Sequence, residues 1–122
     1  MAKRIMIVDD SRVIELQLEQ LLEETGYEVA AICRDGETAI AAYEEVKPDL
    51  VTMDIIMPGM DGLETARTIL EAHPEAKIVM VSSLAYDDTI NESKEIGAKD
   101  FIFKPFDKEQ ILSTFDRVLS ES

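Results

Sequence analysis

The sequence predicts an α/β fold in which a parallel sheet of five strands is covered by helices on both faces. Three observations lead to this prediction. Five short apolar runs alternate along the chain with amphipathic helical patterns. The runs are continuously apolar, which is typical of strands that are buried on both faces. Each run ends at a polar residue or a turn signal, after which a helix can cross back over the sheet with right-handed topology.

The composition bounds the class of protein. The 122 residues suit one domain over residues 1–122 with its own packed core. No apolar run could span a membrane, and two acids interrupt the run near the N-terminus, so we expect no membrane insertion and no signal peptide. One cysteine excludes a disulfide framework, and we expect a cytoplasmic protein. The net charge of −14 argues against nucleic acid as a partner and favours partners with a basic face.

The stretch Leu50–Gly62, LVTMDIIMPGMDG, forms the centre of the predicted sheet. Its apolar start predicts a buried strand, and Asp54 follows at the carboxyl end of that strand, where open α/β sheets bind their ligands. A carboxylate in that place is costly unless a charged group meets it. A Pro-Gly turn follows, and Asp61 then opens a helix predicted over Gly62–Ala72.

The remaining elements follow from the same patterns. The other strands are predicted over Arg4–Val8, Glu28–Cys33, Lys77–Val81 and Phe101–Phe103. The other helices are predicted from Arg12 to about Thr25, from Asp35-Gly36 to Val46, over Asp87–Ile96, and from Asp107 to about Leu119. Ser11 and Asp107 have the chemistry of N-cap residues. Gly26 and Gly97 are expected to end the helices that precede them.

Two of these helices carry particular expectations. On the helix from Arg12 to Thr25, Glu15, Glu19 and Glu23 share a face that differs from the apolar face. The helix over Asp87–Ile96 has almost no large apolar residues. We therefore expect this helix to be held less firmly than its neighbours.

Charged and polar residues mark the carboxyl ends of four strands. Asp9 and Asp10 follow the first strand, Asp54 the third, Ser82 the fourth and Lys104 the fifth. Parallel strands bring these ends to one edge, so the three carboxylates meet if the first and third strands are neighbours. Like charges at such distances repel, and the cluster needs a cation. Three hard oxygens and an open site suit Mg²⁺ with a phosphate as a further ligand.

Lys104 supplies a fixed positive charge at this edge, and Ser82 offers a hydroxyl donor. An isolated aspartate at a strand end is more often a cap or a turn residue. Here the conjunction of three acids with a lysine favours a site for a phosphoryl group on Asp54, which would act as a carboxylate nucleophile.

The motifs IVDDS, MDIIMPGMDG, VSS and KPF, taken in this order, resemble the receiver domain of two-component response regulators. The resemblance covers the whole chain and is strongest to the stand-alone chemotaxis regulators. It implies a flavodoxin-like (βα)5 three-layer sandwich with the strand order 2-1-3-4-5. It also implies a regulator that accepts a phosphoryl group from a histidine kinase with Mg²⁺ and then binds a downstream protein, for which we expect the face of residues 87–103. We expect a monomer.

The resemblance implies that Asp54 is phosphorylated. It assigns the Mg²⁺ ion to Asp9, Asp10, Asp54 and the backbone carbonyl of Ile56. Ile56 and Leu84 are apolar where polar residues are frequent in this family. These two positions flank the route of water to the acyl phosphate, so the departure concerns the rate of dephosphorylation and the partner.

The resemblance further assigns Ser82 and Lys104 to the phosphoryl oxygens. It makes Ser82 and Phe101 the switch residues, although Phe101 lacks the hydroxyl of the tyrosine found in the best-known members and could simply be a core aromatic. It also implies a cis peptide bond between Lys104 and Pro105.

Other classes of protein could carry part of this pattern. A phosphorelay intermediate, or a receiver cut from a longer regulator, fits the motifs nearly as well. A phosphatase of the haloacid dehalogenase type needs an acid two residues after the nucleophile, where this chain has Ile56. A nucleotide or flavin binder needs glycines after the first strand, where this chain has DDSR. We therefore expect no turnover enzyme, but a phosphoacceptor that assists its own phosphotransfer and dephosphorylation.

Overall fold

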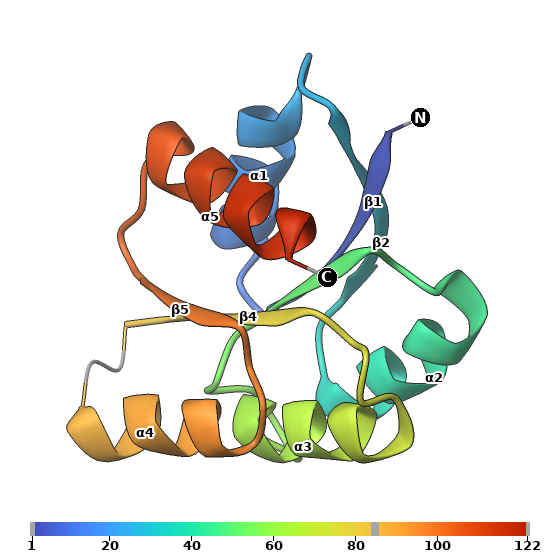
Figure 1. Cartoon of the computed structure of the whole chain (residues 1–122), viewed down its shortest axis with the longest axis vertical. Helices are drawn as coiled ribbons and strands as arrows, with labels where there is room; N and C mark the ends of the chain where they lie inside the picture. The colour runs from blue at the N-terminus through green and yellow to red at the C-terminus, as the bar shows by residue number, and fades with distance from the viewer. Residues whose placement is uncertain (1, 84–85, 122) are drawn as a thin grey trace.

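The computed structural model of the chain describes residues 2–83 and 86–121, over which strands and helices alternate (Figure 1). The strands are β1 (Lys3–Val8), β2 (Tyr27–Cys33), β3 (Leu50–Met53), β4 (Ile78–Ser82) and β5 (Asp100–Phe103). The helices are α1 (Arg12–Leu22), α2 (Gly36–Val46), α3 (Gly62–Ala72), α4 (Asp87–Glu95) and α5 (Lys108–Ser120). The five strands form one parallel sheet in the order β2-β1-β3-β4-β5. The predicted fold class and strand order are therefore confirmed.

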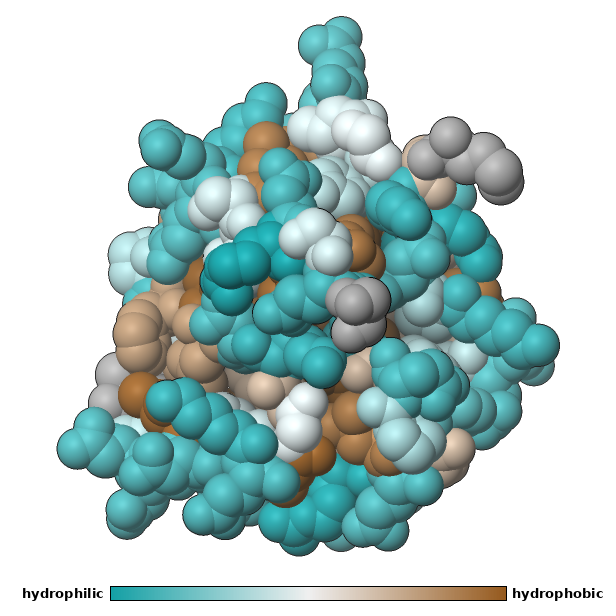
Figure 2. Space-filling model, in the orientation of Figure 1, coloured by the Kyte–Doolittle hydropathy of each residue, from teal (hydrophilic) through white to brown (hydrophobic). Residues whose placement is uncertain are grey.

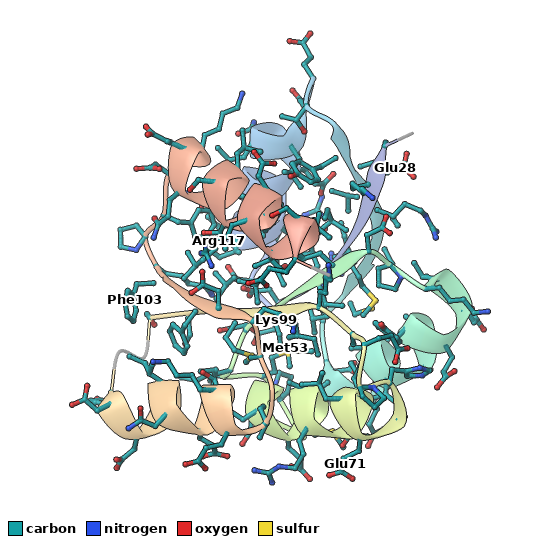
Figure 3. All side chains as sticks on the ribbon, viewed as in Figure 1. Glu28, Met53, Glu71, Lys99, Phe103 and Arg117 are labelled. Carbon is teal, nitrogen blue, oxygen red and sulfur yellow. The ribbon has the colours of Figure 1, made fainter. Side chains whose placement is uncertain are left out.

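Helices α1 and α5 cover one face of the sheet, and α2, α3 and α4 cover the other (Figure 1). Each strand contributes to both layers because successive side chains point to opposite faces. In β1, Ile5 and Ile7 belong to the core under α1 and α5, whereas Met6 and Val8 belong to the core under α2 and α3. Met53 of β3 lies between the sheet and this second helical layer (Figure 3). Burial on both faces explains why the strands are continuously apolar.

Most of the charge lies on the outer surface. Figure 2 shows a mostly hydrophilic face in which hydrophobic side chains gather in small patches. Glu71, for example, points away from the sheet on the outer side of α3 (Figure 3). Among the described residues, no helix combines the length and the apolar composition needed to cross a membrane.

Short polar side chains fix where the helices begin. The Asp107 carboxylate accepts a hydrogen bond of 2.8 Å from the Gln110 N–H, as the sequence predicts. Ser11 likewise accepts the N–H of Ile14 at 3.4 Å. Each cap satisfies an N–H group that has no partner within its own helix.

The predicted end of the first helix is wrong by three residues. Helix α1 ends at Leu22, and the residue with positive φ is Glu24 (58°), whereas Gly26 does not adopt such a conformation. The Thr25 hydroxyl donates a hydrogen bond of 2.6 Å to the Leu22 carbonyl, which the end of the helix leaves without an intrahelical partner. The helix therefore ends where the backbone of Glu23 leaves the helical conformation, and Glu24, not a glycine, takes the left-handed conformation. The prediction for Gly97 is confirmed, since it follows α4 with a φ of 103°.

The prediction that Glu15 lies on a face of α1 apart from the buried apolar face is also wrong. Glu15 is only 3% exposed, unlike a solvated acid. Its carboxylate accepts hydrogen bonds from Arg12 on the same helix and from Arg34, which follows β2. Helical periodicity could not predict this burial because one partner belongs to a different element of the fold.

The first residue of α3, Gly62, packs against the backbone that carries Asp54. A Cβ atom at Gly62 would lie 1.7 Å from the Asp54 carbonyl oxygen and 2.8 Å from the Ile55 Cα. We expect Gly62→Ala to lower the free energy of unfolding by about 2 to 3 kcal/mol, because the backbone of the loop must move to relieve the overlap. Urea unfolding monitored by circular dichroism measures this change.

The matched control is Gly26→Ala, because a Cβ atom at Gly26 would meet nothing within 4 Å. We expect this variant to stay within about 0.5 kcal/mol of the parent. Equal stabilities of the two variants would contradict the close approach of α3 to Asp54.

Candidate functional site

Two buried carboxylates leave the sheet side by side, after β1 and after β3. Val8 pairs with Met53 across these strands, and the Asp54 N–H donates a hydrogen bond of 2.9 Å to the Val8 carbonyl. Asp9 directly follows Val8, and Asp54 directly follows Met53. Because Val8 and Met53 are paired, the two aspartates lie side by side at the carboxyl edge of the sheet. Asp9 and Asp54 are 2% and 7% exposed.

The exposed Asp10 completes a group of three acids. One carboxylate oxygen from each of Asp9, Asp10 and Asp54 lies within 4.8 Å of the other two. Three oxygens at this spacing can contact one divalent cation, and hard oxygen ligands are those that Mg²⁺ prefers. The small number of protein ligands also leaves coordination positions for water and a phosphoryl group. The residues present therefore fit a Mg²⁺ ion.

Lys104, which directly follows the edge strand β5, brings a positive charge to these acids. Its Nζ atom donates a hydrogen bond of 2.9 Å to Asp9 Oδ2 and lies 3.5 Å from Asp54 Oδ1. The backbone positions it, since the Lys104 N–H donates to the Ser82 carbonyl at 3.0 Å. The peptide bond between Lys104 and Pro105 is cis. The lysine side chain is only 17% exposed, so water and salt screen its charge weakly.

The charges around Asp54 are not balanced. Burial, followed by the negative charge of Asp9, raises the pKa of the Asp54 carboxyl from 3.8 to about 6. Lys104 and the Ile55 N–H, which donates to Asp54 Oδ1 at 2.8 Å, lower this pKa but do not cancel the rise. An added cation at the three acids would relieve the imbalance.

The other residues expected at the site surround this cluster. Ser82 is 1% exposed at the end of β4. Ile56, in the loop after Asp54, is 58% exposed. The half-buried Phe101 ring lies 5.2 Å from the ring of Phe103, centroid to centroid. Leu84 lies outside the described residues. The acids and the lysine thus form one cluster, whereas the roles expected of Ser82, Ile56 and Phe101 stay predictions.

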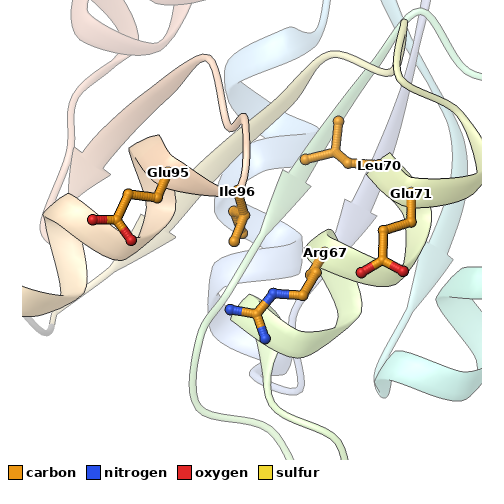
Figure 4. Close-up of a pocket in the computed structure, with 5 residues that line it drawn as sticks. All are labelled: Arg67, Leu70, Glu71, Glu95 and Ile96. Atoms are coloured by element: carbon orange, nitrogen blue, oxygen red, sulfur yellow. The ribbon is translucent and has the colours of Figure 1, made fainter.

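A hollow of the surface lies between α3 and α4 (Figure 4). Its volume is about 410 Å³, and it is lined by Arg67, Leu70, Glu71, Glu95 and Ile96. Arg67 donates a hydrogen bond of 3.3 Å to Glu92, so that an ion pair already joins the two helices here. This pocket shares no residue with the acid cluster and takes no part in the site.

Comparison with known proteins agrees with this geometry. The model of the response regulator receiver domain matches residues 5–116. The chain belongs to this family. Similar relatives are Protein CcdB of Bacillus subtilis, 40% identical over 95% of this chain and 97% of that protein, and Chemotaxis protein CheY of Thermotoga maritima, 39% identical over 97% and 98%. A chain of the CheX–CheY–BeF3–Mg²⁺ complex from Borrelia burgdorferi superposes with a TM-score of 0.93 at 33% identity, covering 98% of this chain and 90% of that chain.

The resemblance predicted from the motifs is thus confirmed, and one supporting contact of the receiver was not predicted. The Ser11 N–H donates a hydrogen bond of 2.8 Å to Asp9 Oδ1 and so helps to orient this buried carboxylate. The signal for this contact was present in the sequence. An aspartate two residues before a serine that caps a helix is the pattern of an Asx-turn.

We expect loss of the Asp54 charge to stabilise the metal-free receiver above about pH 6. The pKa of Asp54 is raised in the folded protein to about 6, so the folded state binds more protons than the unfolded state between about pH 4 and pH 6. The contribution of Asp54 to stability therefore falls as the pH rises through this window. Asp54→Asn should unfold with a free energy about 2 to 3 kcal/mol above that of the parent at pH 7.5, and the difference should vanish near pH 4.

Urea unfolding in EDTA, repeated from pH 4 to pH 8, measures this difference. Asp88→Asn is the control, since Asp88 is an exposed acid in the first turn of α4. This variant should not gain stability over the parent at pH 7.5. A pH-independent effect of Asp54→Asn would show that the Asp54 carboxyl titrates normally.

Proposed function

We propose that this receiver accepts a phosphoryl group on Asp54 from the phosphohistidine of a histidine kinase and then changes its affinity for a partner protein. One observation carries the proposal: a buried, electrostatically strained Asp54 lies among two further acids and Lys104 at the carboxyl edge of the sheet. Similarity over almost the full chain to a chemotaxis protein CheY supports chemotaxis signalling as the setting. We further propose that the protein acts in the cytoplasm as a monomer.

In the proposed transfer, an oxygen of the Asp54 carboxylate attacks the phosphorus atom. The new O–P bond forms as the P–N bond to the histidine breaks, and the imidazole leaves with the electron pair and keeps or takes a proton. Asp54 must be ionised to attack. A pKa of about 6 leaves most of this carboxyl ionised at pH 7.5 even before a cation is bound.

The residues around Asp54 would stabilise the charge that moves onto it. Lys104 Nζ, 3.5 Å from an Asp54 oxygen, is close enough to turn to a phosphoryl oxygen. We assign the Ser82 hydroxyl, at the end of the neighbouring strand, to a second phosphoryl oxygen. A Mg²⁺ ion held by Asp9, Asp10, Asp54 and the Ile56 carbonyl would neutralise charge on the acids and on the phosphoryl group.

An aspartate-dependent phosphatase is the alternative of a different class. It would need a general acid close to Asp54 to protonate the leaving group. The residue two positions later is Ile56, which has no proton to donate and is 58% exposed. A phosphorelay intermediate would use the same site as a chemotaxis regulator. Transfer of the phosphoryl group onward to a second histidine protein would identify it.

We expect acetyl phosphate with Mg²⁺ to leave one acid-stable, base-labile phosphoryl group per chain. Asp54→Asn should carry none, because the nucleophile is gone. Asp10→Asn should lose Mg²⁺ binding and phosphorylation together, since one of three clustered oxygens is removed. Intact-mass spectrometry measures the adduct, and the exposed Asp88→Asn should be labelled like the parent. Many turnovers of acetyl phosphate would indicate the phosphatase, and undiminished labelling of Asp10→Asn would show that the metal lies elsewhere.

Helix α4 is the element best suited to respond to phosphorylation. Its only fully buried residue is Ser93, whereas six residues of α3 are buried. Among the described residues, no side chain caps its first turn. Between α4 and β5 lies a hollow of about 230 Å³, with Phe101 and Phe103 in its wall. Weakly packed elements are those that move most readily. We assign the change of shape to residues 87–103 and the switch to Ser82 and Phe101.

We expect beryllofluoride, which mimics the phosphoryl group, to change amide hydrogen exchange mainly in residues 82–104. The phosphoryl mimic adds charge beside Lys104 and draws the Ser82 hydroxyl toward it, which leaves room for Phe101 to turn inward. Helix α5 should change little, because four of its residues are buried in the opposite layer. Exchange measured by mass spectrometry tests this. A uniform response, or one confined to α1, would contradict the assigned mechanism.

A further inference from the structure

A buried carboxylate outside the acid cluster, that of Glu15, accepts hydrogen bonds from two arginines. Glu15 of α1 is 3% exposed. Arg34 donates to it through both Nε, at 3.3 Å, and Nη2, at 3.0 and 3.2 Å. Arg12 Nη1 donates to Glu15 Oε1 at 2.9 Å. A forked arrangement of this kind fixes the plane of the Arg34 guanidinium group.

Both arginines lie at the edge that carries Asp54. Arg34 directly follows Cys33, whose carbonyl accepts the Asp9 N–H at 3.0 Å. Arg12 directly follows Ser11, whose N–H donates to the Asp9 carboxylate at 2.8 Å. Each arginine is therefore one residue away from a group that is hydrogen-bonded to an acid of the site.

The arrangement leaves positive charge facing solvent. Two guanidinium groups share one carboxylate, so one positive charge stays unbalanced within this group of three side chains. The arginine side chains are 66% and 55% exposed, and the glutamate side chain is 4% exposed. Neutralising Glu15 would need only one arginine. A guanidinium has five N–H donors, and several donors of this pair have no protein acceptor within the described part of the chain.

We propose that Arg12 and Arg34, held in place by Glu15, select a phosphodonor whose docking surface carries carboxylates beside its phosphohistidine. This inference rests on the proposed function and names the chemistry of the donor protein. A chain with a net charge of −14 repels acidic surfaces in general. The arginine pair therefore attracts carboxylates of a partner beside the phosphoacceptor site, whereas the acidic remainder of the surface repels them.

The surface beside the arginines is suited to protein contact. Val13, the residue after Arg12, is 64% exposed, and Leu16, one residue after Glu15, is 45% exposed. Apolar side chains exposed next to fixed charges are typical of protein interfaces, where the apolar part gives contact area and the charges give orientation. The expected donor surface thus presents an apolar patch to α1 and carboxylates to the arginine pair.

The test uses two synthetic peptides, each with one phosphohistidine, flanked by glutamates in one and by glutamines in the other. Transfer to Asp54 is followed by intact-mass spectrometry at low salt. We expect the glutamate peptide to react about three- to tenfold faster with the parent protein, and the ratio to approach one at about 0.5 M NaCl. The triple variant Arg12→Gln, Glu15→Gln, Arg34→Gln should lose the preference without leaving a buried charge unpaired.

The matched control is Arg67→Gln, which lowers the net charge by the same amount as the triple variant and removes an arginine of α3 that pairs with Glu92. It should keep the preference of the parent. Arg34→Gln alone, which leaves the pair of Arg12 and Glu15 intact, should keep part of it and guards against misfolding of the triple variant.

Labelling by phosphoramidate, a small donor with no flanking surface, separates the two proposals. It should label the parent and all three variants at the same rate. If no protein is labelled on Asp54, the proposed function fails. If all are labelled but the parent reacts equally fast with both peptides, or faster with the glutamine peptide, the selection by the arginine pair is overturned.

Discussion

The site depends on two carboxylates that the backbone holds together against their own repulsion. The hydrogen bond between the Asp54 N–H and the Val8 carbonyl, at 2.9 Å, fixes how far Asp54 can lie from Asp9. Relaxation of the side chains cannot undo this separation, because the ladder between β1 and β3 sets it. The apolar cores on both faces of the sheet stabilise the fold against this electrostatic cost. Lys104 offsets this cost only in part, so the pKa of Asp54 stays above its ordinary value.

Much of this arrangement follows from the sequence by simple rules. Continuous apolar runs indicate burial on both faces, and hence a parallel sheet with helices in both outer layers. The shared edge of the strand ends then brings Asp9, Asp10, Asp54 and Lys104 together, on condition that the first and third strands are neighbours. That condition, and the full strand order, came from the resemblance of the motifs to receivers. Periodicity alone does not determine which strands pair.

The features that could not be predicted are those in which one residue depends on a distant one. Glu15 is buried because Arg34, which follows another strand, reaches its carboxylate. Helix α1 ends early, and the Thr25 hydroxyl then satisfies the Leu22 carbonyl. The pKa of Asp54 depends on burial and on charges from β1 and β5 at once. Such effects need the assembled fold, whereas caps such as Asp107 depend on neighbours three residues away and were predicted correctly.

The ion pair between Lys104 and Asp9 joins residues that are 95 positions apart in the chain. Proteins are made from the N-terminus, so β1 and β3 are synthesised well before Lys104, which partly offsets the charge of their acids. A chain that is still on the ribosome, or one that ends before β5, therefore contains the three acids of the cluster but not Lys104. Formation of the complete site therefore has to wait until β5 and Lys104 have been made, and a chain without them lacks the positive charge that partly offsets the repulsion between its acids.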